Sequence, residues 1–234
     1  MAEPVTTETD IQENLLAVGE RIAAAAKAAG REPVAVTLIA ISKVHPAAAA
    51  KAALSAGHRV FGENRVQEAE DKWPALKEAF PDARLHLVGG LQRNKVKGAI
   101  ALFDAIHTID RLKLARAVAQ EMEKSGHRPD CFIQINTGEE AQKGGVLPGD
   151  ADALITACRD DLALPVVGLM CIPPVDEEAS LHFALLGDLA RRNGLPALSM
   201  GMSGDFETAI RFGATHVRVG TGVFGERPAH KPEN

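Results

Sequence analysis

The chain has 234 residues, of which 46% are hydrophobic and 24% are charged, as is ordinary for a globular protein with a substantial core. Its formal net charge of −5 argues against a nucleic-acid-binding or membrane-surface role. The acidic N-terminus is not a secretory signal, and no apolar run approaches membrane-spanning length. Cys131, Cys158 and Cys171 lack disulfide or metal-ligand spacing and fit a reducing compartment, so a cytoplasmic protein is expected.

Two elements open the chain. Apolar residues at helical spacing, including Ile11, Val18 and Ile22, predict a helix over 7–30. A near-continuous run of apolar and β-branched residues then predicts a strand over 34–43, buried on both faces as in a parallel sheet. The strand ends on Lys43, at the carboxyl end where α/β folds place their chemistry. Lys43 is therefore a candidate amine nucleophile, and the alternative is a lysine that extends into solvent.

The rest of the chain alternates between strands and helices. Further strands are predicted over 58–62, 85–88, 105–108, 131–136, 166–170, 197–200 and 215–219. The helices between them are predicted over 46–57, 63–80, 92–102, 110–126, 151–159, 175–192 and 206–212. Asp110 is expected to cap the fourth of these helices. Strict alternation favours one parallel (β/α)8 barrel domain over 1–234, with about 10–228 as its ordered core and one extra N-terminal helix. An open doubly wound sheet is the alternative.

In a barrel, the carboxyl ends of all strands meet at one mouth. The segments expected there are Lys43, Glu63-Asn64, Gly89-Gly90, Asn136, Cys171, Ser203-Gly204 and Gly220-Thr221. The loops Ser203-Gly204 and Gly220-Thr221 predict a phosphate site, because glycines allow close backbone approach and hydroxyls add donors. The alternative is that Ser203 caps its helix and Gly220 eases a turn. Arg218 should face the interior or the mouth, unless it forms an ordinary salt bridge.

A lysine amine, a phosphate site and a buried arginine at one mouth together indicate pyridoxal 5'-phosphate (PLP). Lysine forms a Schiff base with the aldehyde of PLP, and the loops hold its phosphate. The segment 220–225 also matches GxGxxG, but it does not open a βαβ unit that is followed by an acidic residue about 20 positions on. A dinucleotide site is therefore not expected.

Seven segments carry a family resemblance: AISKVHP, VFGENRVQEAEDKW, LHLVGGLQRNKVK, IHTIDRLKLA, IQINTGEEAQKGG, GLMCIPP and LSMGMSGDFETAIRFGATHVRVGTGVFGER. From about residue 10 to about residue 228, the chain resembles the pyridoxal phosphate homeostasis proteins. The resemblance implies a fold-type III PLP-binding barrel, similar to the N-terminal domain of alanine racemase. The chain departs from the family pattern at Gly90, where a histidine is usual, at Arg93, where serine or threonine is frequent, and at Val44-His45.

The resemblance also implies residue roles. Lys43 would form the Schiff base, Asn64 would lie beside the cofactor, and Arg218 would face the pyridine nitrogen. The phosphate would be held by Ser203, Gly204, Gly220 and Thr221.

Two functions fit these features. One is a monomeric protein that buffers or delivers PLP, with PLP-dependent apo-enzymes as candidate recipients. The other is a PLP-dependent amino-acid racemase, but racemisation of the alanine racemase type uses a lysine and a tyrosine, and this chain has no tyrosine. His86, His107 and Cys171 are candidates for a second base, unless they are core residues. We therefore expect a PLP homeostasis protein without robust catalysis, and neither a metal site nor a nucleic-acid or membrane partner.

Overall fold

The structure is a computed structural model that describes residues 7–226. The last two residues of the predicted core, 227 and 228, lie outside this range. The strands are β1 (Thr37–Ile41), β2 (Val60–Glu63), β3 (Arg84–Leu87), β4 (Ala105–Ile109), β5 (Asp130–Ile135), β6 (Val166–Cys171), β7 (Ala197–Met202) and β8 (His216–Val219). The α-helices are α1 (Glu8–Ala28), α2 (Ala47–Ser55), α3 (Val66–Ala79), α4 (Val96–Leu102), α5 (Leu112–Ser125), α6 (Ala151–Thr156), α7 (Ala179–Arg192), α8 (Phe206–Arg211) and α9 (Thr221–Phe224).

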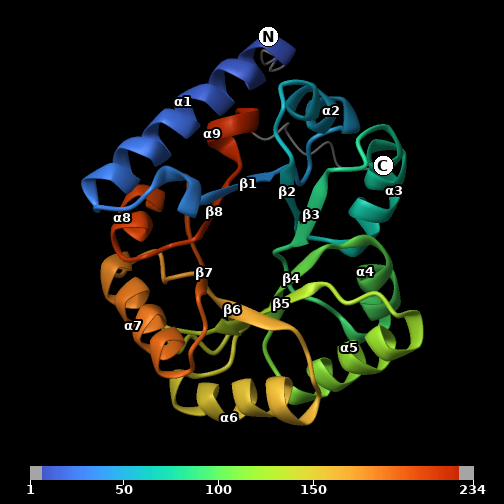
Figure 1. Cartoon of the computed structure of the whole chain (residues 1–234), viewed down its shortest axis with the longest axis vertical. Helices are drawn as coiled ribbons and strands as arrows, with labels where there is room; N and C mark the ends of the chain where they lie inside the picture. Colours follow the sequence, from blue (N-terminus) through green and yellow to red (C-terminus); the bar gives the residue numbers. More distant parts are fainter. Residues whose placement is uncertain (1–6, 227–234) are drawn as a thin grey trace.

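The strands form one closed parallel barrel in sequence order. β8 pairs with β1, and the register places Thr37 opposite His216 and Ala40 opposite Val219. The helices surround this ring of strands (Figure 1). The closed order confirms the predicted (β/α)8 barrel, and the alternative of an open doubly wound sheet is wrong.

Several predicted boundaries differ from the structure. The first strand begins only at Thr37, because Pro33–Ala35 forms a 3₁₀ turn and proline has no N–H to donate to a strand ladder. The helix predicted from residue 92 begins as a 3₁₀ turn over Arg93–Lys95 and continues as α4. The predicted cap at Asp110 is wrong: Arg111 is the N-cap residue of α5, and no side chain caps it.

The extra helix α1 covers the side of the barrel where the chain closes. It lies along α8 and α9 (Figure 1). Its apolar stripe, which includes Ile11, Val18 and Ile22, is buried as the spacing predicted. The Asn14 side chain donates a hydrogen bond of 3.1 Å to the carbonyl of Val223 in α9. α1 therefore supports the two short helices that follow β7 and β8.

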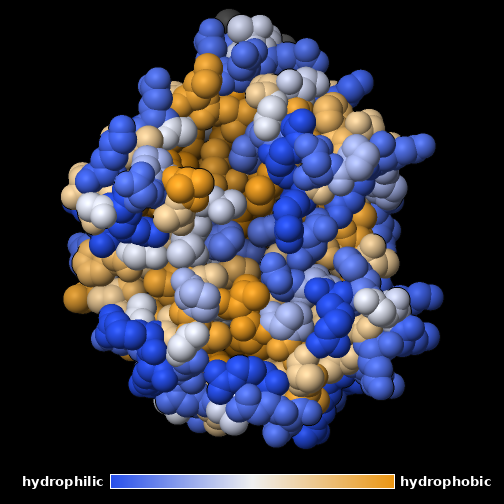
Figure 2. Space-filling view, viewed as in Figure 1, coloured by the Kyte–Doolittle hydropathy of each residue, from blue (hydrophilic) through white to orange (hydrophobic). Residues whose placement is uncertain are grey.

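Hydrophobic side chains gather in hollows of the molecular surface. On the face shown in Figure 2, they line hollows above and below the centre, whereas hydrophilic side chains cross the centre and form most of the rim. Cys131, Cys158 and Cys171 are free and buried, as expected of small apolar residues. No helix within residues 7–226 is long and apolar enough to cross a membrane.

Candidate functional site

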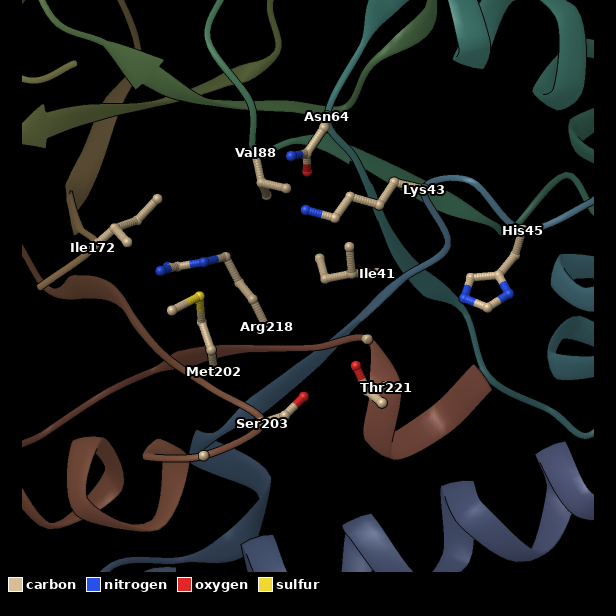
Figure 3. Close-up of a pocket in the computed structure, with 12 residues that line it drawn as sticks. Ile41, Lys43, His45, Asn64, Val88, Ile172, Met202, Ser203, Arg218 and Thr221 are labelled. Atoms are coloured by element: carbon tan, nitrogen blue, oxygen red, sulfur yellow. The ribbon is translucent and has the colours of Figure 1, made fainter. Parts of the chain in front are cut away.

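A cavity of about 300 Å³ opens where the strands end at their carboxyl termini (Figure 3). Its lining residues are Ile41, Lys43, His45, Asn64, Val88, Ile172, Met202, Ser203, Gly204, Arg218, Gly220 and Thr221. All seven residues predicted to bind a cofactor are in this lining. They come from the ends of β1, β2, β7 and β8, so barrel closure brings together residues that are far apart in the sequence. Their role in binding stays a prediction.

Lys43 projects into the cavity from the turn that follows β1. Its side chain extends toward Val88 and Asn64 (Figure 3). Asn64 follows β2, and the end of β3 passes close to it. A Cβ at Gly89 would lie 2.2 Å from the Asn64 carbonyl oxygen, so only glycine allows this approach. The backbone of the third strand end thus helps to place Asn64 beside the lysine.

Two hydroxyl-bearing loops form the opposite wall of the cavity. Ser203 and Gly204 lie between β7 and α8, while Thr221 begins α9 after β8. The hydroxyls of Ser203 and Thr221 point into the same part of the cavity (Figure 3). The alternative that Ser203 caps its helix is wrong, because Asp205 occupies the N-cap position. Asp205 Oδ1 instead accepts a hydrogen bond of 2.6 Å from the N–H of Met202 and closes the turn.

Arg218 is almost fully buried, with 4% of its surface exposed. Its Nη1 donates to Ser199 Oγ at 2.7 Å and its Nη2 to the carbonyl oxygen of Cys171 at 2.8 Å. The salt-bridge alternative is wrong, since no carboxylate within residues 7–226 lies within ion-pair distance of this guanidinium. Burial lowers the pKa of Arg218, but a guanidinium stays protonated in proteins. The cavity therefore has a fixed positive charge in its wall.

A chain of hydrogen bonds continues from Arg218 into the barrel interior. Ser199 Oγ lies 2.9 Å from His107 Nδ1, and His107 Nε2 lies 3.0 Å from His86 Nδ1. Ser199 Oγ accepts from Arg218, and the tautomers of the two rings set the direction of the bonds that His107 makes with Ser199 and His86. Burial lowers the pKa of His86 to about 3 and holds that of His107 well below its usual range. Both imidazoles are therefore neutral near pH 7.

Several residues expected at the mouth lie elsewhere. Glu63 is fully buried, and it accepts hydrogen bonds from Ser42 and Lys72 instead of facing the cavity. Cys171 is also fully buried, and burial raises the pKa of its thiol to about 12. Asn136 bonds within its own loop, at 2.8 Å to the carbonyl of Glu140. Successive side chains of a strand point to opposite faces, so a position at a strand end does not by itself direct a side chain into the mouth.

The sequence did not identify five other residues that line the cavity, among them His45, Ile172 and Met202. The apolar ones carry no chemical signal in a single sequence. The position of His45, two residues after Lys43, was a usable signal. Its ring packs on Phe224, with the ring centroids 5.3 Å apart, and points away from the Lys43 amine (Figure 3).

The closed barrel, with a lysine after its first strand and hydroxyl loops after its last two, is similar to the barrels of alanine racemase-like proteins. Residues 14–228 match the family model described as alanine racemase, N-terminal domain. The alanine racemase of Corynebacterium glutamicum, at 19% identity and a TM-score of 0.66 over 94% of this chain and 63% of its own, shares the fold.

Closer relatives define the family. The pyridoxal phosphate homeostasis protein of Pseudomonas aeruginosa is 42% identical over 227 residues, which cover 95% of this chain and 98% of that protein. That of Escherichia coli K12 is 38% identical over 231 residues, with 95% and 99% covered. The chain belongs to the pyridoxal phosphate homeostasis protein family, which confirms the resemblance seen in its sequence. The structure of PipY from Synechococcus elongatus with PLP bound is 36% identical, with a TM-score of 0.78 over 92% of this chain and 100% of that one.

Proposed function

We propose that this chain binds PLP in the cavity at the barrel mouth, attached covalently to Lys43, and acts in PLP homeostasis as a buffer or carrier. The observation that carries the proposal is the presence of the Lys43 amine, the Arg218 guanidinium and two hydroxyl loops around one cavity. The PLP-bound structure of PipY and the names of the homologous homeostasis proteins support the choice of cofactor.

The residues present fit PLP. A Cβ at Gly204 would meet no protein atom within 4 Å, so packing within the protein does not explain a glycine there. A ligand that approaches the backbone closely does explain it. The hydroxyls of Ser203 and Thr221 project into the same space and would donate hydrogen bonds to a phosphate. A phosphate at this end leaves the Lys43 amine at the other side of the cavity for the aldehyde.

When bound, PLP supplies an aldehyde that condenses with a primary amine, and one water molecule is released. Lys43 provides the amine, and Asn64 lies beside it. Arg218 would donate a hydrogen bond to the ring nitrogen, since it has donors only. A guanidinium that keeps its proton does not protonate that nitrogen, so the site disfavours chemistry that needs a fully protonated ring.

We infer a carrier and not an efficient enzyme, because the candidate second bases are not at the cavity. His86 and His107 form a buried chain beneath Arg218, and the Cys171 thiol is buried with its pKa raised to about 12. The chain also has no tyrosine. A racemase needs a second proton-transfer group on the face opposite the lysine. PLP-dependent apo-enzymes are the proposed recipients, and a monomer is the proposed state, which light scattering would test.

The test is the visible absorption spectrum of the purified protein with PLP, before and after borohydride reduction. We expect a Schiff-base band that borohydride fixes to the peptide containing Lys43, and its loss in Lys43→Ala. Added amino acids should then cause neither turnover nor deuterium exchange at Cα. A protein that stays colourless with PLP would refute binding, and sustained racemisation would refute the carrier role.

A further inference from the structure

Helix α3 holds the peptide groups on both sides of Lys43. The Lys72 ammonium donates a hydrogen bond of 2.9 Å to the carbonyl oxygen of Ser42, immediately before Lys43. Glu68 Oε1 accepts a hydrogen bond of 2.6 Å from the N–H of Val44, immediately after it. Glu68 and Lys72 are four residues apart on α3, so they lie on one face of that helix. Two charged side chains of one helix face therefore fix the backbone that carries the lysine.

Glu68 and Lys72 belong to one network of charged side chains, which also includes the buried carboxylate of Glu63. Lys72 Nζ lies 2.9 Å from Glu63 Oε1 and 3.1 Å from Glu68 Oε1. Glu63, which is fully buried, also accepts hydrogen bonds from Ser42 Oγ at 2.7 Å and from Trp73 Nε1 at 3.1 Å. Buried charges hold fixed positions when they are paired, because leaving either one alone is unfavourable. Lys72 is thus anchored to the barrel wall, and Glu68 is anchored by Lys72.

The turn at Val44 needs such a restraint. Its φ of 61° lies in the left-handed region, which a β-branched residue rarely adopts. Packing does not explain this conformation, since 53% of Val44 is exposed. Strained backbone persists only where the surroundings over-determine it, and it concentrates at functional sites. The Val44 N–H donates its hydrogen bond to Glu68, and the turn is also closed by a hydrogen bond of 3.2 Å from the His45 N–H to the Ser42 carbonyl oxygen.

We propose that Glu68, anchored by Lys72, is a positioning residue: it holds the strained Val44 turn and thereby directs the Lys43 side chain into the cavity. This inference rests on the proposed function of Lys43. Within residues 7–226, neither Glu68 nor Lys72 lines the cavity, so their effect is transmitted through the backbone. If Val44 relaxed to an ordinary φ, the Cα–Cβ direction of Lys43 would turn and its amine would leave the position from which it reaches a bound aldehyde.

The first test uses the apoprotein and needs no cofactor. Amide hydrogen exchange at Val44 is followed by NMR in the wild type, in Glu68→Ala and in Glu68→Gln. Glu68→Ala should speed exchange about tenfold or more, because it removes a charge-assisted acceptor. Glu68→Gln retains an acceptor oxygen and should stay within about threefold of the wild type. Glu78→Ala is the matched control, since Glu78 is an exposed residue of the same helix.

The second test measures how fast PLP is released when hydroxylamine displaces it from Lys43 as an oxime, from the loss of its visible absorption. Glu68→Ala should release PLP about tenfold faster, with the thermal midpoint of the apoprotein close to that of Glu78→Ala. The double variant Glu68→Ala/Val44→Gly should recover much of the slow release, because glycine adopts a positive φ without strain. Glu68→Gln should behave like the wild type.

The inference is overturned if a folded Glu68→Ala keeps both slow Val44 exchange and slow PLP release. If Glu68→Ala fails to fold, the double variant Glu68→Ala/Val44→Gly is decisive. A double variant that folds and still releases PLP fast also overturns the inference. Failure of the proposed function looks different. In that case the wild type forms no borohydride-fixed link to Lys43, whereas the exchange measurement on the apoprotein is unaffected.

Discussion

Ser199 Oγ lies 2.7 Å from Arg218 Nη1, in the buried interior of the barrel. The same oxygen lies 2.9 Å from His107 Nδ1, so one hydroxyl joins the guanidinium to the buried histidines. Arg218 Nη2 is held by the Cys171 carbonyl. With two nitrogen atoms held from inside the barrel, the orientation of the guanidinium plane is set before any ligand arrives.

Ser199→Ala should destabilise the fold, because it leaves Arg218 Nη1 and His107 Nδ1 without their shared partner in a dry interior. The expected loss is roughly 1–3 kcal/mol in the free energy of unfolding. Urea unfolding measures it, with Ser55→Ala as the control, because Ser55 is exposed at the end of α2. If both variants lose the same amount, the bridge contributes nothing to stability.

The buried histidines predict how stability depends on pH. Burial lowers the pKa of His86 to about 3 and that of His216 to about 4, and it lowers the pKa of His107 as well. In the unfolded chain they take up protons near 6.5, so between about pH 6.5 and 4 the unfolded state binds more protons. Their contribution to stability is complete above pH 6.5 and is lost as the pH falls toward 4.

Each of these histidines should steepen the fall by roughly 1.4 kcal/mol per pH unit. Urea unfolding at a series of pH values between about 6.5 and 5 measures this slope. This window lies above the range of the surface carboxylates whose pKa is lowered, such as Asp82 and Asp152. His216→Asn should reduce the slope by about one proton. A flat dependence in the wild type would mean that the histidines are already charged in the folded protein.

The barrel could be predicted because its signals are local. The apolar run that ends in Lys43 can be recognised from side-chain types within a few residues. Similar runs recur along the chain and predict the other strands in the same way. The glycine and hydroxyl loops were visible for the same reason, and parallel topology alone places them at one mouth. Parallel topology was therefore enough to predict that Lys43 and Thr221 lie at the same end of the barrel, without any knowledge of interatomic distances.

What could not be predicted depends on register and on distant contacts. Ser199 and His107 are 92 positions apart, and their hydrogen bond depends on how β4 and β7 face each other across the barrel. The strand-end residues Glu63 and Cys171 were placed at the mouth, but their side chains turn into the protein. The strained Val44 turn was also hidden, since valine gives no sequence signal for a positive φ.

Gly204→Ala should weaken PLP binding without disturbing the fold. An added Cβ meets no protein atom within 4 Å, so the free energy of unfolding should change by no more than about 0.5 kcal/mol. The methyl group would occupy the space through which a phosphate approaches the backbone, and the Kd for PLP should rise about tenfold. Titration followed by absorption measures it. Gly90→Ala is the control, because Gly90 is equally open but does not line the cavity. Equal affinities in the two variants would contradict a phosphate at this loop.

Gly89→Ala should behave in the opposite way and impair both folding and binding. Its Cβ would lie 2.2 Å from the Asn64 carbonyl oxygen and 2.8 Å from the Asn64 Cα, which are backbone atoms that cannot rotate away. The ends of β2 and β3 must separate to admit it, at a cost of roughly 1–3 kcal/mol. Urea unfolding should therefore show a clear loss beside Gly90→Ala, its neighbour in the chain. Because the strain displaces Asn64 from its place beside Lys43, borohydride should also fix less PLP to the lysine at equal PLP concentration. A Gly89→Ala protein with the stability and PLP content of Gly90→Ala would show that the contact between these strand ends does not position Asn64.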